Sequence, residues 1–435
     1  MSFPAIIMFV LFFLWTFAGM PLGHAMLASS IVYLLMSGSD IGLVASQSLK
    51  GIYGGFVMLA VPLFIFSAEV MNAGAMTDKL FNFASLLVGR FKGGLAHVNV
   101  VSSVIFSGMS GSALADAAGP GKISIDMMTK AGYRPGFAAA LTSTSAILGP
   151  IIPPSIPMVL YGVVTNTSIG YLFLGGVLPG LFLAAVMMGV VAVQARIQDF
   201  PTQPRQSMKE AVATIRDAGP TLLLPVILLG GIYSGAVTPT EAAAVAAFVA
   251  LMLAIFWYRT LTPRRLFEVL LTSSKATAMV AITIAGAVVM NYIVAAERFP
   301  EVMGVWMSQM HMGPMAFMLG VTLLFIVLGA LFDTLLLLLI VIPILMPTVR
   351  ELGIDPVYFG VVSTVNMMIG LIHPPMGQVV YLVSGITGIK VGAILREIWV
   401  LLFMMVVSLF ILVIFPFITL WLPQMAGYVP EGAFH

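Results

Sequence analysis

The chain has 435 residues, of which 60% are hydrophobic and only 8% are charged, whereas a soluble domain carries about 25% charged residues. This composition excludes a soluble domain, and a net charge of only +2 offers no basic surface to nucleic acid. Cysteine is absent, which excludes disulfides, thiolate catalysis and cysteine metal sites.

Apolar stretches long enough to cross a lipid bilayer, about 20 residues each, recur from Ile6 to Leu422, so we expect an all-α polytopic membrane protein. The N-terminal stretch has no positive n-region and no small-residue cleavage site, and it is interpreted as the first span instead of a signal peptide. In the first half we predict five spans, near residues 4–20, 21–37, 52–74, 135–165 and 168–194.

One segment in each half remains outside this count. Residues 94–130 carry a polar, small-residue interruption, Ser107 to Ser112, between two arms that are each short for a span. We predict a re-entrant hairpin that enters and leaves from the cytoplasmic side. Residues 314–349 carry Gly329 to Thr334 at the corresponding place, which predicts a second re-entrant hairpin that enters from the periplasmic side.

Positive residues predict the orientation, because Lys and Arg favour the cytoplasmic side of short loops. Two loops hold four of them each and are separated by two apolar segments, so both loops are predicted to be cytoplasmic. With an odd number of spans in each half, both termini are then predicted to be periplasmic. The two sets are Arg196, Arg205, Lys209 and Arg216, and Arg259, Arg264, Arg265 and Lys275.

The two halves resemble each other. A shift of 221 positions places Gly149 on Gly370 and the pair Pro153, Pro154 on Pro374, Pro375. Such an internal repeat, with an odd number of spans in each copy, predicts inverted repeats, which are typical of transporters. The first repeat is predicted over residues 1–218, with its hairpin at about 94–130 and a broken helix at about 135–165. The second is predicted over residues 219–435, with its hairpin at about 314–349 and a broken helix at about 356–386.

The two proline pairs interrupt long apolar stretches. Proline lacks a backbone donor and clashes with the preceding turn, so two in succession open the helix and free carbonyl oxygens. Freed carbonyls suit a hard cation, and the N-termini of half-helices suit a carboxylate. The alternative is a plain proline kink that serves packing, but a repeat-related pair, each opposite a glycine-serine hairpin, favours binding.

Three ionisable residues are candidates for function. Asp116 and Asp333 are predicted at the hairpin tips, where an unpaired carboxylate is costly in a bilayer. The alternative for each is that it caps a helix N-terminus through its oxygens. His373 precedes the second proline pair, where it contributes either a backbone carbonyl to a cation or a titratable proton carrier. The carbonyl role is favoured, because it needs no particular side chain.

Six segments resemble, in order and over nearly the whole chain, the large membrane subunit of tripartite ATP-independent periplasmic (TRAP) transporters, which is DctM-like. They are PLFIFSAEVMNAG from Pro62, GGLAHVNV from Gly93, SGMSGSALADAAG from Ser107, GPIIPPSIPMVLYG from Gly149, GAVTPTEAAAVAA from Gly235, and IGLIHPPMG from Ile369.

The resemblance implies an elevator-type carrier of the bacterial inner membrane, with a static scaffold and a moving transport domain built from both hairpins and both broken helices. It implies sodium symport without a resident cofactor, a small four-span TRAP membrane subunit, and a periplasmic substrate-binding protein that delivers an organic acid, such as a dicarboxylate. One sodium site of the family is similar to Gly329, Gly370, His373 and Met376 here. The repeat-related site is similar to Ser107, Gly149, Ile152 and Ser155. The family usually has Thr where this chain has His373.

A substrate carboxylate is predicted to lie between the two hairpin tips, where half-helix dipoles and bound cations balance its charge. The residues expected near it are Ser110, Ser112, Thr334 and Asn366.

Three other functions are considered. A self-sufficient sodium/dicarboxylate symporter would need no partner, and a channel would show no saturable counterflow. An intramembrane hydrolase would need a base within hydrogen-bond reach of a nucleophile, but Ser107 and His373 lie in opposite repeats. We therefore expect no enzyme. No Walker loop is present, so no ATP-driven transport is expected.

Overall fold

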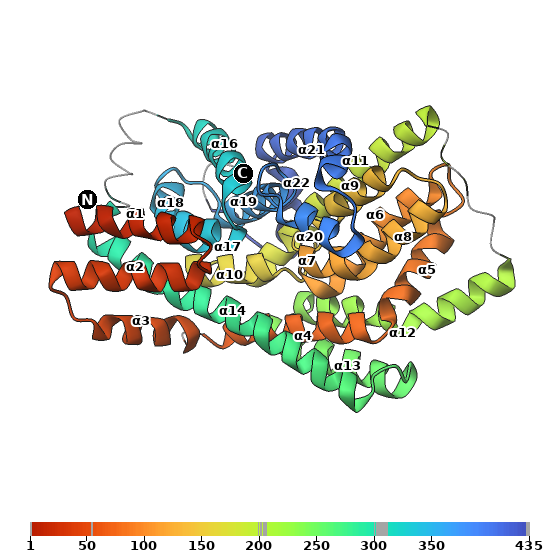
Figure 1. Ribbon diagram of the computed structural model, residues 1–435, viewed down its shortest axis with the longest axis horizontal. Helices are drawn as coiled ribbons and strands as arrows, with labels where there is room; N and C mark the ends of the chain where they lie inside the picture. Colours follow the sequence, from red (N-terminus) through yellow and green to blue (C-terminus); the bar gives the residue numbers. More distant parts are fainter. Residues whose placement is uncertain are drawn as a thin grey trace.

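The structure is a computed structural model that describes residues 2–53, 55–198, 200, 202, 207–299, 301 and 312–431. Every regular element in these ranges is helical. Eight helices of the described chain are long and apolar enough to cross a membrane by length and composition. The fold is therefore that of an all-helical polytopic membrane protein (Figure 1).

Helices from both halves lie along the left and lower sides of Figure 1, and we call them the arm helices. The longest, α14, packs against α2, α3 and α4, while α13 packs on α4 and α12 packs on α5. The 34 residues of α14 correspond to about 50 Å of helix, more than the bilayer core of about 30 Å, so α14 must tilt to remain within it. The arm helices are α1 (Phe3–Phe17), α2 (Leu22–Ser37), α3 (Gly42–Tyr53), η1 (Phe56–Leu59), α4 (Ala60–Ala73), α5 (Met76–Val88), α12 (Met208–Tyr233), α13 (Pro239–Met252), η3 (Leu253–Trp257) and α14 (Pro263–Ala296).

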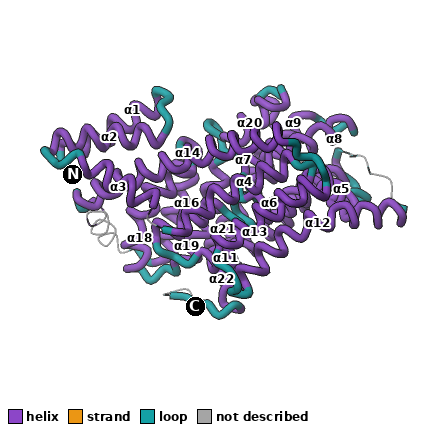
Figure 2. Tube along the Cα trace, turned by 90° about the horizontal axis from the view of Figure 1, so that it is seen from below, coloured by secondary structure: helices purple, strands orange, loops and turns teal. Residues whose placement is uncertain are grey.

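The remaining helices form a second group, which we call the core helices (Figure 2). From the first half these are α6 (Gly94–Ser110), α7 (Ala113–Asp116), η2 (Ala117–Gly121), α8 (Lys122–Lys130), α9 (Pro135–Ala146), α10 (Ile156–Thr165) and α11 (Ile169–Ile197). From the second half they are α16 (Pro314–Leu331), α17 (Thr334–Leu336), η4 (Leu337–Val341), α18 (Ile342–Glu351), α19 (Pro356–Gly370), α20 (Gln378–Thr387), α21 (Val391–Ile414) and α22 (Phe417–Met425).

Two short helices, α9 and α19, occupy the centre of the core helices. Nearly every residue of both is buried, including their hydroxyl and amide side chains. In the first half α6 packs on α9, and in the second half α16 packs on α19. The contacts also cross between halves, since α21 packs on α9 and α11 packs on α19. Each half thus makes corresponding contacts: α9 packs against α6 and against α21 of the other half, and α19 packs against α16 and against α11 of the other half.

A pair of helices lies at each position where a hairpin is predicted. After α6 the chain turns at Gly111, whose φ of 63° lies in the left-handed region that glycine favours. The return arm, α7 to α8, contains the π-turn η2 and contacts α6. In the second half α16 is followed by the return arm α17 to α18, which contains the π-turn η4. Both arms of the second pair are long enough to cross a membrane. Their length therefore does not distinguish a re-entrant hairpin from two membrane spans.

The polar loop between the halves is shorter than the sequence predicts. A capping box begins α12, because the Ser207 amide donates to Glu210 Oε2 at 2.7 Å and the Glu210 amide donates to Ser207 Oγ at 3.3 Å. The predicted loop that holds Arg196, Arg205, Lys209 and Arg216 is therefore wrong at both ends. Arg196 lies in the last turn of α11, Lys209 and Arg216 lie on α12, and Arg205 is outside the described residues.

The second basic loop is likewise shorter than predicted. Proline at the start of α14 favours helix initiation, and the helix then runs without interruption past Lys275, which the sequence placed in the loop. A second capping box begins α13, since the Glu241 amide donates to Thr238 Oγ1 at 3.3 Å and the Thr238 amide donates to Glu241 Oε2 at 2.7 Å. Arg196, Lys209, Arg264 and Arg265 thus lie in the terminal turns of α11, α12 and α14, whereas Lys275 lies within α14.

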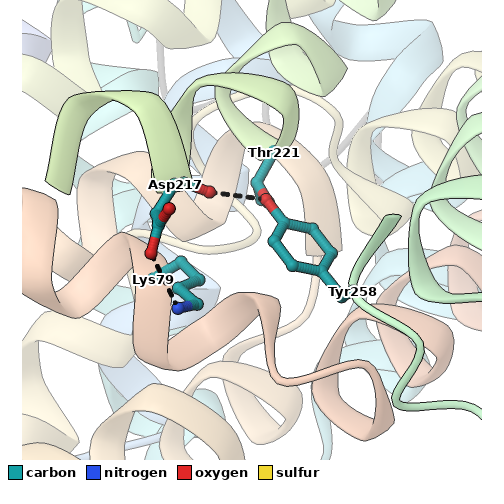
Figure 3. Close-up of polar contacts among 4 residues, drawn as sticks. All are labelled: Lys79, Asp217, Thr221 and Tyr258. Carbon is teal, nitrogen blue, oxygen red and sulfur yellow. Dashed lines mark hydrogen bonds and ion pairs between the residues drawn. The ribbon is translucent and has the colours of Figure 1, made fainter. Parts of the chain in front are cut away.

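A polar junction joins arm helices of both halves at one end of the molecule (Figure 3). Lys79 of α5 forms an ion pair with Asp217 of α12 at 3.1 Å. The Tyr258 hydroxyl, just after η3, donates to the Asp217 carbonyl at 2.7 Å and lies 2.8 Å from Thr221 Oγ1. The ion pair is substantially exposed and such pairs contribute about 0–1 kcal/mol. The junction therefore positions the arm helices more than it stabilises them.

Candidate functional site

The tip of the first helix pair meets the break between α9 and α10. The break contains the proline pair, whose Pro153-Pro154 bond is cis. A methyl group added at Gly111 would lie 2.7 Å from the Pro154 carbonyl oxygen, and one added at Gly149 would lie 3.1 Å from the Ser112 carbonyl oxygen. Backbone therefore approaches backbone here, and glycine makes this approach sterically acceptable.

The tip of the second pair meets the break between α19 and α20 in the same way. A methyl group added at Gly370 would lie 2.8 Å from the Gly329 carbonyl oxygen. The Met376 amide donates to the Ala330 carbonyl at 3.3 Å and so closes the contact. The Pro374-Pro375 bond is also cis. Two junctions are thus present, one in each half of the chain, and in each the tip of a helix pair meets a helix break.

The two junctions differ in exposure. Every residue of the first break is buried, and so are all four predicted ligand residues there, Ser107, Gly149, Ile152 and Ser155. At the second break Gly329 and Gly370 are buried, His373 is partly buried and Met376 is 54% exposed. The second junction therefore opens to the surface of the chain, whereas the first is enclosed.

The side chains at the junctions mostly bond within their own segments. Ser107 Oγ donates to the Val104 carbonyl at 2.6 Å. Ser155 Oγ donates to the Pro150 carbonyl and accepts from the Met158 amide at 3.2 Å. His373 Nδ1 lies 2.6 Å from the Pro374 carbonyl. These bonds leave hydroxyl lone pairs and backbone carbonyls at the first junction, and backbone carbonyls at the second, as the groups that can bind a cation.

Two of the predicted substrate residues carry polar atoms without partners. Ser110 Oγ and Asn366 Oδ1 are buried and have no hydrogen-bond partner within the described residues. The other polar atom of Asn366, Nδ2, donates to the Thr322 carbonyl at 2.9 Å. Ser112 caps α7 by accepting from the Ala115 amide at 3.3 Å, and Thr334 begins α17. Buried unpaired polar atoms are costly, so Ser110 and Asn366 are available to a ligand.

Contacts between the halves bring the elements of these residues together. The first tip, α7, contacts α20 of the second repeat, and the π-turn η4 of the second hairpin contacts α10 of the first. Within the second repeat α17 contacts α19, which places Thr334 beside the helix of Asn366. Each hairpin therefore lies between its own break and the second half-helix of the other repeat.

The two aspartates predicted at the tips behave differently. Asp333 caps α17, since Oδ1 accepts from the Leu335 amide at 2.8 Å, and Oδ2 accepts from Gln378 Nε2 at 2.7 Å. The capping interpretation is confirmed for this residue. For Asp116 both the tip position and the capping role are wrong. Ser112 caps the helix instead, and Asp116 lies one turn further on, at the end of α7.

Sequence reasoning missed a buried chain of polar side chains between α6 and α9. Asn99 Nδ2 donates to Thr142 Oγ1 at 2.6 Å, and Ser145 Oγ donates to Asn99 Oδ1 at 3.1 Å. Ser103 Oγ donates to Ser145 Oγ at 3.1 Å. The available signal was spacing: Asn99 and Ser103 are four apart, and Thr142 and Ser145 three apart, so each pair lies on one helix face.

Comparisons with known proteins agree over almost the whole chain. Residues 9–418 match the family described as "Tripartite ATP-independent periplasmic transporter, DctM component". The chain is 42% identical over 387 residues to the sialic acid TRAP transporter large permease protein SiaM of Vibrio cholerae, covering 89% of this chain and 90% of that protein. It is 40% identical over 358 residues to the C4-dicarboxylate TRAP transporter large permease protein DctM of Pseudomonas aeruginosa, covering 81% and 84%.

Two further relatives extend the comparison. The 2,3-diketo-L-gulonate TRAP transporter large permease protein YiaN of Escherichia coli is 35% identical over 382 residues, covering 88% of this chain and 90% of that protein. Among solved structures, the YdaH transporter of Alcanivorax borkumensis, described as having an unusual topology, matches with a TM-score of 0.60 at 15% identity, covering 86% and 87%. At that identity the likeness shows the fold alone.

Proposed function

The chain belongs to the DctM component family of tripartite ATP-independent periplasmic transporters, and on that premise we propose that it is the large subunit of a sodium-coupled symporter that imports an organic acid. The family consists of transporter subunits and not of enzymes, so the hydrolase considered above is set aside. The observation that carries the proposal is the pair of repeat-related junctions, at which a hairpin tip meets a broken helix.

Sodium is the proposed coupling ion at both junctions. The groups present are backbone carbonyls and hydroxyls, and oxygen ligands suit a hard cation. The first site is assigned to Ser107, Gly149, Ile152 and Ser155, and the second to Gly329, Gly370, His373 and Met376. Irregular backbone at membrane depth is tolerated where protein covers it, and the residues of the first break are all buried.

The substrate carboxylate is proposed to lie between the tips. The unpaired Ser110 hydroxyl would donate to the carboxylate, and the unpaired Asn366 Oδ1 would accept from a hydroxyl group of the substrate, with Ser112 and Thr334 assigned to the same site. The relatives are named for sialic acid, C4-dicarboxylates and 2,3-diketo-L-gulonate, all of which are organic acids. A carboxylate at the N-termini of α10 and α20 would also gain from the positive ends of both half-helices.

Movement and partners complete the proposal. The core helices contain both tips and both breaks, so they are proposed to move as the elevator against the arm helices, which form the scaffold in the inner membrane. The relatives are named large permease proteins, which supports a small membrane subunit as partner. The word periplasmic in the family description supports a periplasmic binding protein that delivers the substrate.

The partner requirement is tested by reconstitution. We expect sodium-driven uptake of an organic acid into proteoliposomes only when this chain, the small subunit and the cognate binding protein are all present. Omitting either partner should reduce uptake to the background of empty liposomes, and saturable counterflow should exclude a channel. Full sodium-driven uptake by this chain alone would contradict the proposal and support a self-sufficient sodium/dicarboxylate symporter.

Both termini are proposed to be periplasmic, and two contacts support this. The basic residues Arg264 and Arg265 lie at the start of α14, while the Ser2 amide donates to Glu297 just past its far end, at 2.8 Å. The Ser2 hydrogen bonds also lower the pKa of Glu297. Similarly, α11 ends at the basic residue Arg196, and Tyr171 near its start lies 4.7 Å from Tyr428, ring to ring.

Alkaline phosphatase fusions test this topology, because the enzyme is active only outside the cytoplasm. Fusions after Met1 and after Glu431 should both be active, whereas a control fusion after Thr202, between the basic ends of α11 and α12, should be inactive. An inactive fusion at either terminus, with normal expression of the fusion protein, would contradict the proposed orientation.

A further inference from the structure

A fully buried carboxylate in the first repeat has no role in the two junction sites. Asp116 is 0% exposed, and neither of its side-chain oxygens has a hydrogen-bond partner among the described residues. A buried charge of this kind is strongly disfavoured unless it is paired. Something that the chain itself does not supply must therefore neutralise Asp116.

The surroundings of Asp116 are polar and equally buried. Ser103 of α6 interacts with the carboxylate and continues into the buried chain of Ser145, Asn99 and Thr142, all of which are at most 2% exposed. The helix α9 lies against the π-turn that follows Asp116, since a methyl group added at Gly121 would lie 2.7 Å from Thr142 Cγ2. Carboxylate, hydroxyl and amide oxygens from three elements thus gather in one enclosed place.

The second repeat shows that folding does not require this carboxylate. The shift of 221 positions places Asp116 on Leu337, which is also fully buried and begins the second π-turn. The fold therefore accommodates an apolar side chain at this position in one copy and carries an unpaired charge in the other. π-turns of this kind are frequent at functional sites. A ligand for Asp116 explains the difference between the copies.

We propose that Asp116, with oxygens of Ser103, Ser145 and Asn99, binds a third sodium ion in the first repeat, apart from the two junction sites. This inference rests on the proposed sodium coupling. Each of these four side chains offers an oxygen, which suits a hard cation, and a single carboxylate balances a single positive charge. Nowhere in the described ranges do three His, Cys, Asp or Glu side chains cluster to hold a metal, so a transition metal is not favoured.

A sodium ion and a proton can each neutralise the carboxylate, so the number of sodium ions bound per chain distinguishes the two.

The test measures sodium binding by the purified complete transporter in lipid nanodiscs, with radioactive sodium in a choline background of constant ionic strength. Asp116→Asn should bind one sodium ion fewer per chain than the wild type. Ser103→Ala removes one neutral ligand and should raise the half-saturating sodium concentration of one site about tenfold, as a loss of about 1.4 kcal/mol does. Asp126→Asn, an exposed carboxylate on α8, is the control and should bind like the wild type.

Asp116→Leu separates binding from folding, because it copies the second repeat. In sodium-free buffer it should unfold at the same temperature as the wild type or higher, since no uncompensated charge remains buried. In sodium it should gain less thermal stability than the wild type. If Asp116→Asn binds as many sodium ions per chain as the wild type, the third site is refuted, while the two junction sites are unaffected. A wild-type transporter that binds no sodium would overturn both this site and the proposed coupling.

Discussion

Gly370→Val is expected to abolish sodium-dependent uptake while the chain still inserts into the membrane. Even a single methyl group at Gly370 would lie 2.8 Å from the Gly329 carbonyl oxygen and 2.9 Å from the Gly329 Cα. Neither atom can move without displacing the hairpin tip, so the carbonyls at the junction would lose their geometry. A displacement of about 1 Å at a binding centre costs on the order of 100-fold in rate. The larger valine side chain would displace the tip further than a methyl group would.

The first junction offers a graded comparison. A methyl group at Gly149 would lie 3.1 Å from the Ser112 carbonyl oxygen, which is tight but less severe than the contact at Gly370. We therefore expect Gly149→Val to abolish uptake as well, but Gly149→Ala to retain more activity than Gly370→Ala. The matched control is Gly385→Ala in α20, where an added methyl group meets nothing within 4 Å. Uptake by Gly370→Val at the wild-type rate, at equal amounts of inserted protein, would refute the second sodium site.

The helix breaks follow from local chemistry, which is why the sequence predicts them. Two prolines in succession end a helix wherever they occur, and the repeat shift identifies Gly149 and Gly370 as equivalent. The same holds for the capping box at Thr238, where cap, proline and Glu241 lie within four residues. Such features need no knowledge of what the chain packs against.

The errors concern features that depend on a partner element. The helix α12 begins in a polar stretch, so hydrophobic periodicity gives no sign of its first turns, and only the box of Ser207 and Glu210 marks the start. Asp116 was placed at the tip because nothing local shows that Ser112 takes the cap. The burial of Asp116 depends on how α6 and α9 pack around it. Contacts between segments about 40 residues apart cannot be predicted from a single sequence.

The second prediction with a large expected effect concerns the driving force. A sodium gradient at fixed pH should drive uptake, whereas a pH gradient in sodium-free medium should not. The first junction offers carbonyl and hydroxyl oxygens, and the second offers backbone carbonyl oxygens. These groups bind cations but do not titrate near neutral pH. His373 carries the imidazole side chain at the second junction, and its Nδ1 lies 2.6 Å from the Pro374 carbonyl. In this position the ring bonds to its own turn, while the backbone carbonyl remains as the proposed ligand.

His373→Thr distinguishes the two roles of this residue. If the backbone carbonyl is the ligand, the variant keeps it and adds a hydroxyl of the kind that the family usually has there. Sodium-driven uptake should then stay within about twofold of the wild type, which corresponds to a change of about 0.5 kcal/mol. His373→Gln is the companion variant, since it keeps a polar side chain that does not titrate, and it should also remain sodium-driven. If only the pH gradient drives uptake and both variants destroy it, the histidine carries protons and the sodium assignment at the second junction fails.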